Sequence, residues 1–536
     1  MLNLAQQDVI LSKKKKKKHF MKKTNLLLLF TLFISISVLA QIKERKLDKV
    51  IQHSLETFDV PGISVGIIKD GKIVYAKGHG VRSLSNNKEM NKNTLVGIAS
   101  NSKGFTCFAL ALLADEGKLD WDDKVRKHIP EFKMPEAWVT EEFTIRDLVT
   151  HRSGLGLGAG DLMFFPEGGN FTIDDVLANM SKQTPESSFR SEFKYNNNMF
   201  IIAGEVIHRV SGLTWEEFIE KRILQPVGMK NSKASYSRVT DKTNIIDAHT
   251  RTEGEVTQIP HDWSDLANPA GGIMSNVTDM LTWADFLMND AVTKNGDRLL
   301  SEKQMHNLWQ LQTPLPVKKD NDYNTHFSGY SLGWFVSDVN GHLQVAHTGG
   351  LLGTVTQFTM IPDLDLGIVV LTNQMVGSAF SSITNTIKDS YLGYKDRNWV
   401  KKKGKSNEGW ISYNDNIKKE VYNKVDQMLK KNTETSLKIE GTYKDNWFGN
   451  LVISKENNKF FIQSERNPAI KGELLPYNET TYVAKWSNRS FDADVYVLFT
   501  FDENGIAKEA TMKPIAPITD FSFDFGDLHF TKMEDK

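Results

Sequence analysis

The tetrapeptide S-N-S-K at positions 100–103 stands at the start of an apolar segment that predicts a helix as far as Glu116. Positions three apart on a helix share a face, so Ser100 and Lys103 come within hydrogen-bond reach. A serine hydroxyl is a weak nucleophile until a base takes its proton, and burial can lower the pKa of a lysine enough for that task. The segment therefore predicts nucleophilic catalysis, although a helix-capping serine beside a solvated lysine has the same letters.

Tyr195 and Asn197 form a second candidate group, directly before a predicted helix that runs from Asn198 to Val210. A phenol can relay a proton, and an amide two residues further on can orient a substrate carbonyl or hold a lysine. Consecutive asparagines before a helix are also typical of a plain turn, so this group carries little weight by itself.

The third group, H-T-G-G at positions 347–350, ends a predicted strand. Glycines at a strand end let a ligand approach the backbone closely and leave N–H groups accessible. Taken alone, the motif is more often a strand end without a catalytic role. The three groups gain meaning as a set, because each has the local context that its chemistry needs: a helix start, a loop before a helix, and a strand.

With S-x-x-K, Y-x-N and H-x-G in this order, the chain resembles the serine β-lactamase-like family. This family includes class C β-lactamases, penicillin-binding DD-peptidases, D-aminopeptidases and esterases, and S-x-x-K marks related penicillin-recognising enzymes. The resemblance covers about residues 42 to 392. Further matching segments are Gly97 to Ala99, Lys118 to Asp120, Leu148 to Leu155 and Pro269 to Gly272.

The resemblance implies a role for each residue of the first two groups. Ser100 would form an acyl-enzyme, and Lys103 would be its base or proton relay. Tyr195 would shuttle protons in acylation and deacylation. Asn197 would hold the substrate amide and Lys103.

The resemblance also assigns the third group to substrate binding. His347 would lie opposite Tyr195, on the edge strand that binds the substrate together with Thr348 and Gly349. The backbone N–H groups of Ser100 and Gly350 would form the oxyanion hole. One departure matters: true β-lactamases have K-T-G here, and a histidine is mostly uncharged at pH 7. This difference favours the peptidase and esterase branches over antibiotic hydrolysis.

The N-terminal segment predicts export. Two lysines precede an apolar stretch, Leu26 to Leu39, which is short for a membrane span, and small residues suit cleavage before Gln41. We expect Met21 to be the true start and residues 1–20 to be a mis-assigned start. A basic tail with a membrane anchor is the alternative. After cleavage we expect no stable membrane span.

Composition limits the partners. Residues 1–40 hold eight lysines and one acid, so the remaining chain has 58 basic and 65 acidic side chains and a net charge of −7. This argues against nucleic acid as a partner, since phosphate binding needs a basic surface. Cys107 is the only cysteine, so export without disulfides favours a bacterial envelope, with a periplasmic or secreted protein. No metal-ligand spacing is present, and we expect no metal or other cofactor.

Four parts are predicted along the chain of 536 residues. Residues 1–40 are the extension and signal peptide. Residues 42–395 are an α+β domain of the β-lactamase/transpeptidase type, in which helices flank an antiparallel sheet. Residues 396–432 are lysine-rich and predict a linker with one helix, Ile417 to Lys430. Residues 433–532 predict a small β-barrel-like domain, a candidate for oligomerisation.

The sequence as a whole predicts an exported serine hydrolase that acts through an acyl-enzyme on an amide, a peptide or an ester bond, with a small molecule or peptide as substrate. D-amino-acid peptides are included, because an envelope protein meets peptidoglycan. The alternatives are a β-lactamase or penicillin-binding DD-peptidase, and a non-catalytic protein that binds cell-wall fragments.

Overall fold

An eight-stranded antiparallel sheet forms the centre of the first domain, in the order β2-β1-β12-β11-β10-β9-β8-β7. Its strands are β1 (Gly62–Lys69), β2 (Lys72–Gly80), β7 (Thr313–Leu315), β8 (Ser328–Tyr330), β9 (Phe335–Val339), β10 (His342–Leu351), β11 (Thr354–Ile361) and β12 (Leu366–Thr372). The computed structural model describes residues 42–431 and 437–534. The predicted signal peptide and the start at Met21 therefore lie outside the described residues.

Strand β12 shows how the sequence builds the two faces of the sheet, because side chains alternate along a strand. Ile368 and Val370 pack into the cluster on one face, and Val369 and Leu371 pack into the cluster on the other. Both sets are fully buried. A strand that is apolar at every position thus fits a sheet that is covered by helices on both sides.

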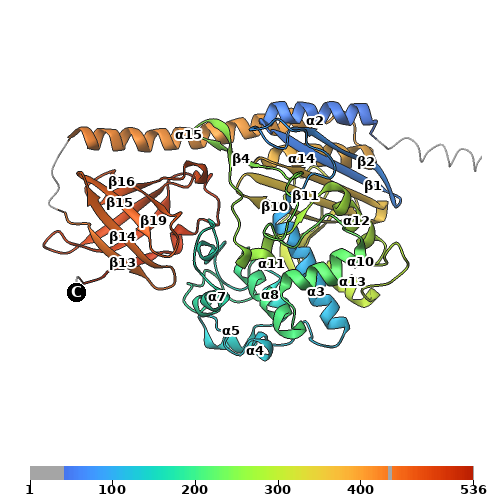
Figure 1. Ribbon diagram of the computed structural model, residues 1–536, viewed down its shortest axis with the longest axis horizontal. Coiled ribbons are helices and arrows are strands. Elements are labelled where there is room, and N and C mark those ends of the chain that lie inside the picture. The colour runs from blue at the N-terminus through green and yellow to red at the C-terminus, as the bar shows by residue number, and fades with distance from the viewer. Residues whose placement is uncertain (1–41, 432–436, 535–536) are drawn as a thin grey trace, which may run out of the picture.

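Helices cover both faces of this sheet (Figure 1). Helices α2 (Glu44–Phe58) and α14 (Gly377–Leu392) pack on one face, where Leu47, Ile51 and Ile383 belong to the same buried cluster as Ile368. Helices α3 (Ser102–Asp115), α8 (Asn198–Ser211) and α12 (Val277–Met288) lie on the other side. The α+β fold of the β-lactamase/transpeptidase type is therefore confirmed.

The helical part of this domain is built mainly between α3 and α12. Three of its helices begin with a capping box, in which a threonine and an acid three residues later satisfy each other's backbone N–H groups. The threonines are Thr144 before α6 (Ile145–Leu148), Thr172 before α7 (Ile173–Met180) and Thr214 before α9 (Trp215–Ile219). The remaining helices are α4 (Val125–His128), α5 (Ala137–Glu142), α10 (Gln225–Val227), α11 (Asn268–Gly271) and α13 (Glu302–Trp309). Two short sheets pair β3 (Val96–Gly97) with β6 (Met274–Ser275) and β4 (Ala248–Thr252) with β5 (Glu255–Ile259).

The C-terminal part is a closed barrel of eight antiparallel strands, which confirms the predicted β-barrel domain. Its strands are β13 (Gly441–Asp445), β14 (Gly449–Glu456), β15 (Lys459–Ser464), β16 (Lys471–Pro476), β17 (Thr481–Trp486), β18 (Val495–Phe501), β19 (Ala507–Pro514) and β20 (His529–Lys532). The sequence pattern predicts strands at 441–443, 450–454, 459–463, 481–486 and 495–501, which correspond to β13, β14, β15, β17 and β18, but it misses β16, β19 and β20. Buried positions in β19 are the small Ala507 and Ala510 as well as Met512, so its alternation is hidden among charged residues.

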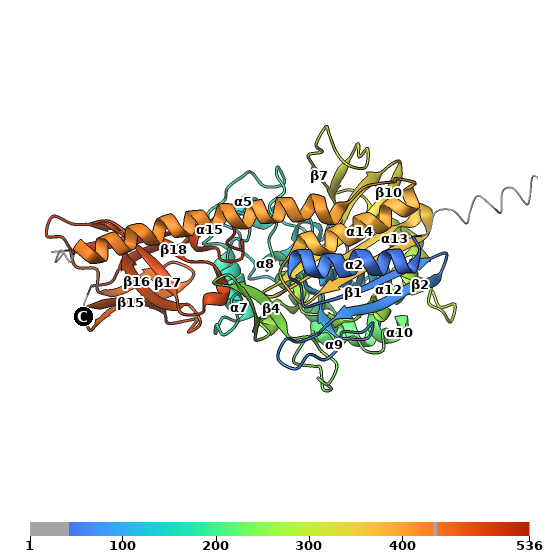
Figure 2. The ribbon, with the colours of Figure 1, turned by 90° about the horizontal axis from the view of Figure 1, so that it is seen from above.

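Helix α15 (Trp399–Lys431) joins the two domains. The sequence predicted a linker whose helix starts only at Ile417, but the structure has one continuous helix of 33 residues. Its first turn buries Trp399 and Val400 in the α2–α14 cluster, and its second half packs Val421 and Val425 against the barrel. Because each end of the helix has apolar contacts with one domain, the lysine-rich middle remains helical. Figure 2 shows α15 running along both domains.

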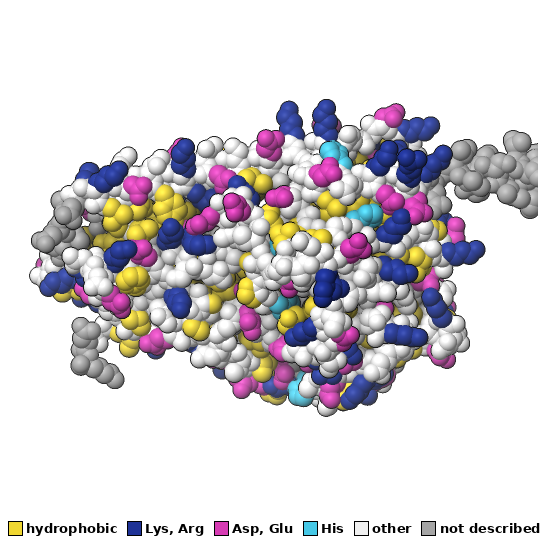
Figure 3. Space-filling model, turned by 45° about the horizontal axis from the view of Figure 1, so that its top comes forward, with side chains coloured by type: hydrophobic (Ala, Val, Ile, Leu, Met, Phe, Trp, Pro, Cys, Tyr) yellow, Lys and Arg dark blue, Asp and Glu magenta, His cyan; other side chains and the backbone are white. Residues whose placement is uncertain are grey.

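The surface of the described part has mixed charge. Basic and acidic side chains are interspersed over the face that Figure 3 shows. Among residues 42–431 and 437–534, no helix is both long enough and apolar enough to cross a membrane.

Candidate active site

Ser100 lies in a tight turn between β3 and α3, within the 3-10 segment Ala99–Asn101. The preceding Ala99 has φ +51°, a left-handed conformation that non-glycine residues rarely adopt. Asn101 anchors the turn, because its side-chain amide donates to Thr356 Oγ1 at 2.8 Å and to the carbonyl of Ile98 at 3.0 Å. Ser100 itself remains partly exposed. The turn therefore presents this hydroxyl at the surface of a rigid, buried support.

Lys103 lies one turn into the helix with its ammonium group fully buried. Its Nζ donates to Ser100 Oγ at 3.2 Å, to Asn197 Oδ1 at 2.7 Å and to the carbonyl of Ala270 at 2.8 Å. Burial lowers the pKa of Lys103 to about 7, while the carboxylate of Asp161 acts in the opposite direction. A substantial neutral fraction near pH 7 is what a general base next to a serine needs.

Tyr195 lies over the same pair of residues. Its ring centre is 4.8 Å from Lys103 Nζ. Burial raises the pKa of Tyr195 above its ordinary value, and the hydroxyl of Ser100 opposes this shift. The phenol is therefore protonated at neutral pH and can donate a proton towards Ser100 or towards a group bound there.

Asn197 links Lys103 to a buried carboxylate that the sequence analysis did not single out. Its Nδ2 donates to Asp161 Oδ2 at 2.8 Å, which turns Oδ1 towards Lys103. Asp161 is fully buried, and burial raises its pKa to about 7, although bonds from Asn197 and Ser522 act against this. The available signal was an acid directly before the apolar run from Leu162 to Phe165.

His347 lies next to Tyr195, with the ring centres 6.3 Å apart. Its Nδ1 is 2.6 Å from the carbonyl oxygen of Thr348. Because a carbonyl can only accept, Nδ1 carries the proton, and Nε2 accepts from the hydroxyl of Tyr330 at 3.1 Å. Burial lowers the pKa of His347 to about 3, and the nearby Lys103 acts in the same direction. The imidazole is therefore neutral, and both of its nitrogens are bonded within the protein.

Strand β10 is an interior strand of the sheet, and only its second half has an open edge. Strand β9 pairs with His342 to Ala346, whereas from His347 onward the pairing is with β11. At Gly349 the strand runs so close to the turn before Ser100 that an added Cβ would lie 2.2 Å from the carbonyl oxygen of Ile98. Thr348 and Gly350 are exposed. The resemblance implied that the strand with His347 is an edge strand, and this is correct only for residues 347–351.

His151 supports Tyr195 from behind. It is fully buried, its ring centre lies 4.1 Å from that of Tyr195, and its Nδ1 accepts from the backbone N–H of Asn196 at 3.1 Å. Burial lowers the pKa of His151 well below its ordinary value. This histidine is a neutral packing residue that fixes the phenol ring.

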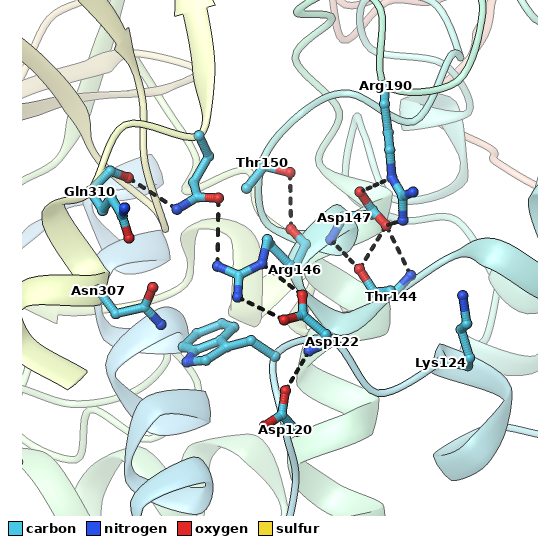
Figure 4. A network of polar contacts seen from close by, with 12 residues as sticks. Asp120, Asp122, Lys124, Thr144, Arg146, Asp147, Thr150, Arg190, Asn307 and Gln310 are labelled. Carbon is cyan, nitrogen blue, oxygen red and sulfur yellow. Dashed lines mark hydrogen bonds and ion pairs between the residues drawn. The ribbon is translucent and has the colours of Figure 1, made fainter. Parts of the chain in front are cut away.

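A polar network holds the segment before His151 in place (Figure 4). Asp147 is fully buried, accepts from Arg190 at 2.6 Å and closes the capping box with Thr144. Arg146 pairs with Asp122 at 2.9 Å on the exposed side. These bonds fix α6 and therefore the position of His151 beneath the site.

A cavity of about 610 Å³ lies beyond the open end of β10, and its lining includes the polar side chains of Asp247, Gln258 and His261 as well as apolar ones. It shares two segments with the site: Gly97 precedes the Ser100 turn, and Leu351 follows Gly350. Its wall also includes Ile245, Ile259, Met274 and Leu352. Among residues 42–431 and 437–534, no group of three or more His, Cys, Asp or Glu is arranged to hold a metal ion.

Two families match the chain. Residues 47–390 match the Beta-lactamase family, and residues 430–532 match a domain of unknown function, DUF3471. Protein flp of Staphylococcus aureus strain MW2 is 27% identical over 332 residues, which are 62% of this chain and 63% of that protein. The unguisins hydrolase ungD' of Aspergillus campestris is 25% identical over 347 residues, 62% of each chain. The matched part thus spans less than two thirds of these relatives.

Solved structures share the fold across both domains. The octameric penicillin-binding protein homologue from Pyrococcus abyssi matches with a TM-score of 0.59 and 23% identity, over 92% of this chain and 100% of that one. A crystal structure of SurE matches with a TM-score of 0.53 and 16% identity, over 91% and 98%. At these identities the likeness concerns the fold alone.

Proposed function

The chain belongs to the beta-lactamase family, and we propose that it is an exported serine hydrolase that cleaves an amide, peptide or ester bond through an acyl-enzyme on Ser100. The observation that carries the proposal is the fully buried Lys103, which bonds to Ser100 Oγ at 3.2 Å and whose pKa burial lowers to about 7. A lysine that only stabilises the fold has no need to lie against an accessible serine.

Acylation follows from this geometry. Neutral Lys103 takes the proton of Ser100 Oγ, and the oxygen forms a bond to the substrate carbonyl carbon. The carbonyl electron pair moves to its oxygen, for which we propose the backbone N–H groups of Ser100 and Gly350 as donors. When the tetrahedral carbon collapses, the bond to the leaving amine or alcohol breaks. Tyr195 gives that group a proton and regains one from protonated Lys103.

Deacylation runs through the same groups. Neutral Lys103 takes the proton of Tyr195 while Tyr195 accepts one from a water molecule, whose oxygen attacks the acyl carbon. The bond to Ser100 Oγ breaks, and protonated Lys103 returns the proton to that oxygen. Asn197 keeps Lys103 oriented throughout, because its Oδ1 accepts from Nζ at 2.7 Å.

The neutral His347 supports the peptidase and esterase branches. In a β-lactamase a lysine at this position offers a permanent cation to the substrate carboxylate. Here the imidazole is 2% exposed, with a pKa of about 3 because of its burial. We therefore propose a carboxylic ester or an amide, including D-amino-acid peptides, ahead of a β-lactam.

Export and assembly are further parts of the proposal. The apolar stretch behind two lysines at the N-terminus supports export to the periplasm or beyond the cell. The matched Pyrococcus abyssi protein is octameric, which supports testing this protein for homo-oligomers through its barrel. Sedimentation of the purified chain measures the assembly, and cell fractionation measures the location.

Labelling with two probes tests the function. The chain from Gln41 onward is treated with a fluorophosphonate and with a fluorescent penicillin, beside Ser100→Ala. We expect the fluorophosphonate to label wild type and to leave Ser100→Ala unlabelled. Labelling by both probes would favour the penicillin-recognising alternative. If neither probe labels the folded protein, the hydrolase proposal fails and the binding-protein alternative replaces it.

A further inference from the structure

We infer that the loop between β19 and β20, residues 515–528, completes the active site from the barrel domain: Ser522 positions the Asp161–Asn197–Lys103 chain, and Phe521 forms a wall of the substrate cleft. The inference rests on the proposed hydrolase function of Ser100. It makes the barrel a working part of the catalytic unit rather than an appended domain.

A continuous chain of hydrogen bonds joins the barrel loop to the nucleophile. Ser522 Oγ donates to Asp161 Oδ2 at 2.9 Å, and the same oxygen accepts from Asn197 Nδ2 at 2.8 Å. Asn197 Oδ1 accepts from Lys103 Nζ at 2.7 Å, which reaches Ser100 Oγ at 3.2 Å. Each of these side chains has one orientation that satisfies its hydrogen bonds to both neighbours. A substitution at Ser522 therefore changes the position of Lys103.

This series of hydrogen bonds is important because its members are buried. Asp161 is fully buried and Ser522 is 9% exposed. A buried carboxylate depends on its donors, and losing one of them costs far more than it would at the surface. Asn198 Nδ2, at 3.4 Å from Asp161 Oδ1, is a longer contact. Ser522 is therefore one of the two close side-chain donors that hold Asp161 against Asn197.

The loop approaches too closely for its contacts to be incidental. The backbone N–H of Gly160 donates to Asp524 Oδ2 at 2.6 Å. At Gly158, with φ +74°, an added Cβ would lie 2.7 Å from the carbonyl oxygen of Phe521. The segment that carries Asp161 thus has a glycine at 158, where the loop touches it and a Cβ would clash.

Phe521 lies at the open side of the same site. Its ring stands edge-on to that of Tyr195, with the ring centres 5.9 Å apart. Although it is a large apolar side chain, Phe521 is 40% exposed, and the nearby Leu157 is 49% exposed. An exposed phenylalanine beside the proposed proton donor is placed to contact the substrate rather than to fill a core.

Other contacts fix the barrel to the first domain, so the loop is free to serve the site. Arg466 pairs with Asp175 at 3.0 Å, and Asn467 Nδ2 donates to the carbonyl of Pro166 at 2.7 Å. The rings of Phe171 and Phe448 also stack, with centres 6.1 Å apart. A change at Ser522 therefore leaves the docking of the barrel intact.

The charged and titratable groups around Lys103 and Asp161 define the direction of the electrostatic effect. Lys103 is faced by Asp161, Cys107, His151 and His347, and Asp161 is also faced by Asp520 and Asp524 of the barrel loop. The bond from Ser522 lowers the pKa of Asp161 against the effect of burial, and a charged Asp161 raises that of Lys103. Losing the hydroxyl therefore raises the pKa of Asp161 and lowers that of Lys103.

The test compares Ser522→Ala with Ser522→Thr, which keeps a hydroxyl, and with Ser490→Ala. Ser490 is also a buried barrel serine, but its Oγ donates to Asn488 Oδ1. We expect fluorophosphonate labelling of Ser522→Ala to be about tenfold slower at its plateau, because the base loses its fixed position. The pH of half-maximal rate should move down. Ser522→Thr should restore both, and Ser490→Ala should match wild type.

A second readout needs no reaction. The titration of Lys103 is followed by NMR in the full chain with labelled lysine, and its signal is assigned with Lys103→Met. An unchanged titration in Ser522→Ala overturns the inference even if wild type proves unreactive. A lowered midpoint supports it. Failure of wild type to label at all would sink the hydrolase proposal separately.

Phe521→Ala tests whether Phe521 contacts the substrate. Leu498→Ala is the control, because Leu498 is an equally exposed barrel side chain at 42%. The substrates are p-nitrophenyl acetate and p-nitrophenyl hexanoate. We expect the ratio of kcat/KM for the long ester to that for the short one to change at least about fivefold in Phe521→Ala, since a contact with the substrate is lost. Equal ratios in wild type and both variants would remove Phe521 from the site.

Discussion

Lys103 donates a 2.7 Å hydrogen bond to the side-chain oxygen of Asn197, and both groups are buried. The bond joins the helix after the proposed nucleophile to the segment that carries Tyr195. It orients the amine towards Ser100, and the amide cannot take its proton away. The consequences of this arrangement can be measured.

Replacing Lys103 with methionine separates catalysis from stability. We expect the labelling rate at pH 7 to fall about 10³-fold, because Ser100 loses its base. The thermal midpoint should fall, because Asn197 Oδ1 and the carbonyl oxygen of Ala270 lose their buried donor, but the protein should remain folded at the labelling temperature. Labelling kinetics and calorimetry on the same samples give both values. A fully active Lys103→Met protein would contradict the assigned base.

The pH dependence of the labelling rate should reflect the titration of Lys103. Its pKa of about 7 results from burial, and only the neutral amine can accept the proton of Ser100. The labelling rate should therefore rise about tenfold per pH unit below pH 7 and level off above it. The same limb in kcat/KM, once a substrate is found, would support this reading. A limb near pH 4 would point to a carboxylate instead.

Asp161→Asn should shift the rise of the labelling rate that is expected below pH 7. The carboxylate raises the pKa of Lys103 against the effect of burial. Without its charge the pKa of Lys103 falls, so the half-maximal rate should move about one unit towards lower pH. Asp262→Asn is the matched control, because burial raises the pKa of that carboxyl as well, to about 6, and its partner is the N–H of Glu167. Identical profiles in the two variants would refute the coupling.

Tyr330→Phe should destabilise the fold without moving the pH profile. The variant leaves Nε2 of His347 as a buried acceptor without its donor, which costs about 1–3 kcal/mol of unfolding free energy in urea. The limb near pH 7 should remain, because burial keeps the pKa of His347 at about 3. Tyr391→Phe should cost nothing, since the Tyr391 hydroxyl is buried without a partner among the described residues. A shifted limb in Tyr330→Phe would assign it to His347.

Two neighbouring glycines should respond differently to alanine. At Gly349 the new Cβ would lie 2.2 Å from the carbonyl oxygen of Ile98, whereas at Gly350 nothing lies within 4 Å. Gly349→Ala should therefore lower the thermal midpoint and slow labelling, because β10 must move away from Ser100. Gly350→Ala should keep the thermal midpoint of wild type. Equal thermal midpoints in both variants would show that β10 can move away from Ser100 with little loss of stability.

Local patterns were sufficient for much of the fold. The continuous apolar run of β12 and the turn at Asn340-Gly341 depend on neighbours in sequence, so the antiparallel strands from Gly333 to Thr372 could be predicted. The same holds for Ser100 and Lys103, whose spacing on a helix brings them together without help from the rest of the chain. Their catalytic roles remain predictions.

Patterns failed where burial came from distant partners. Helix α15 was predicted to start at Ile417, because its first half lacks an apolar stripe of its own. Trp399 and Val400 become buried only when α2 and α14 pack around them. Asp161 was missed for the same reason: its partners Asn197 and Ser522 lie 36 and 361 positions away.

The sequence by itself determined the nucleophile turn, the helix that carries Lys103 and the consecutive strands β9 to β12, because each depends on spacing within a few residues. Only the tertiary structure decided the electrostatics of the site. Burial by distant segments gives Lys103 a pKa of about 7 and keeps His347 neutral. Desolvation depends on everything that packs around a group, and for Asp161 this includes the barrel residue Ser522.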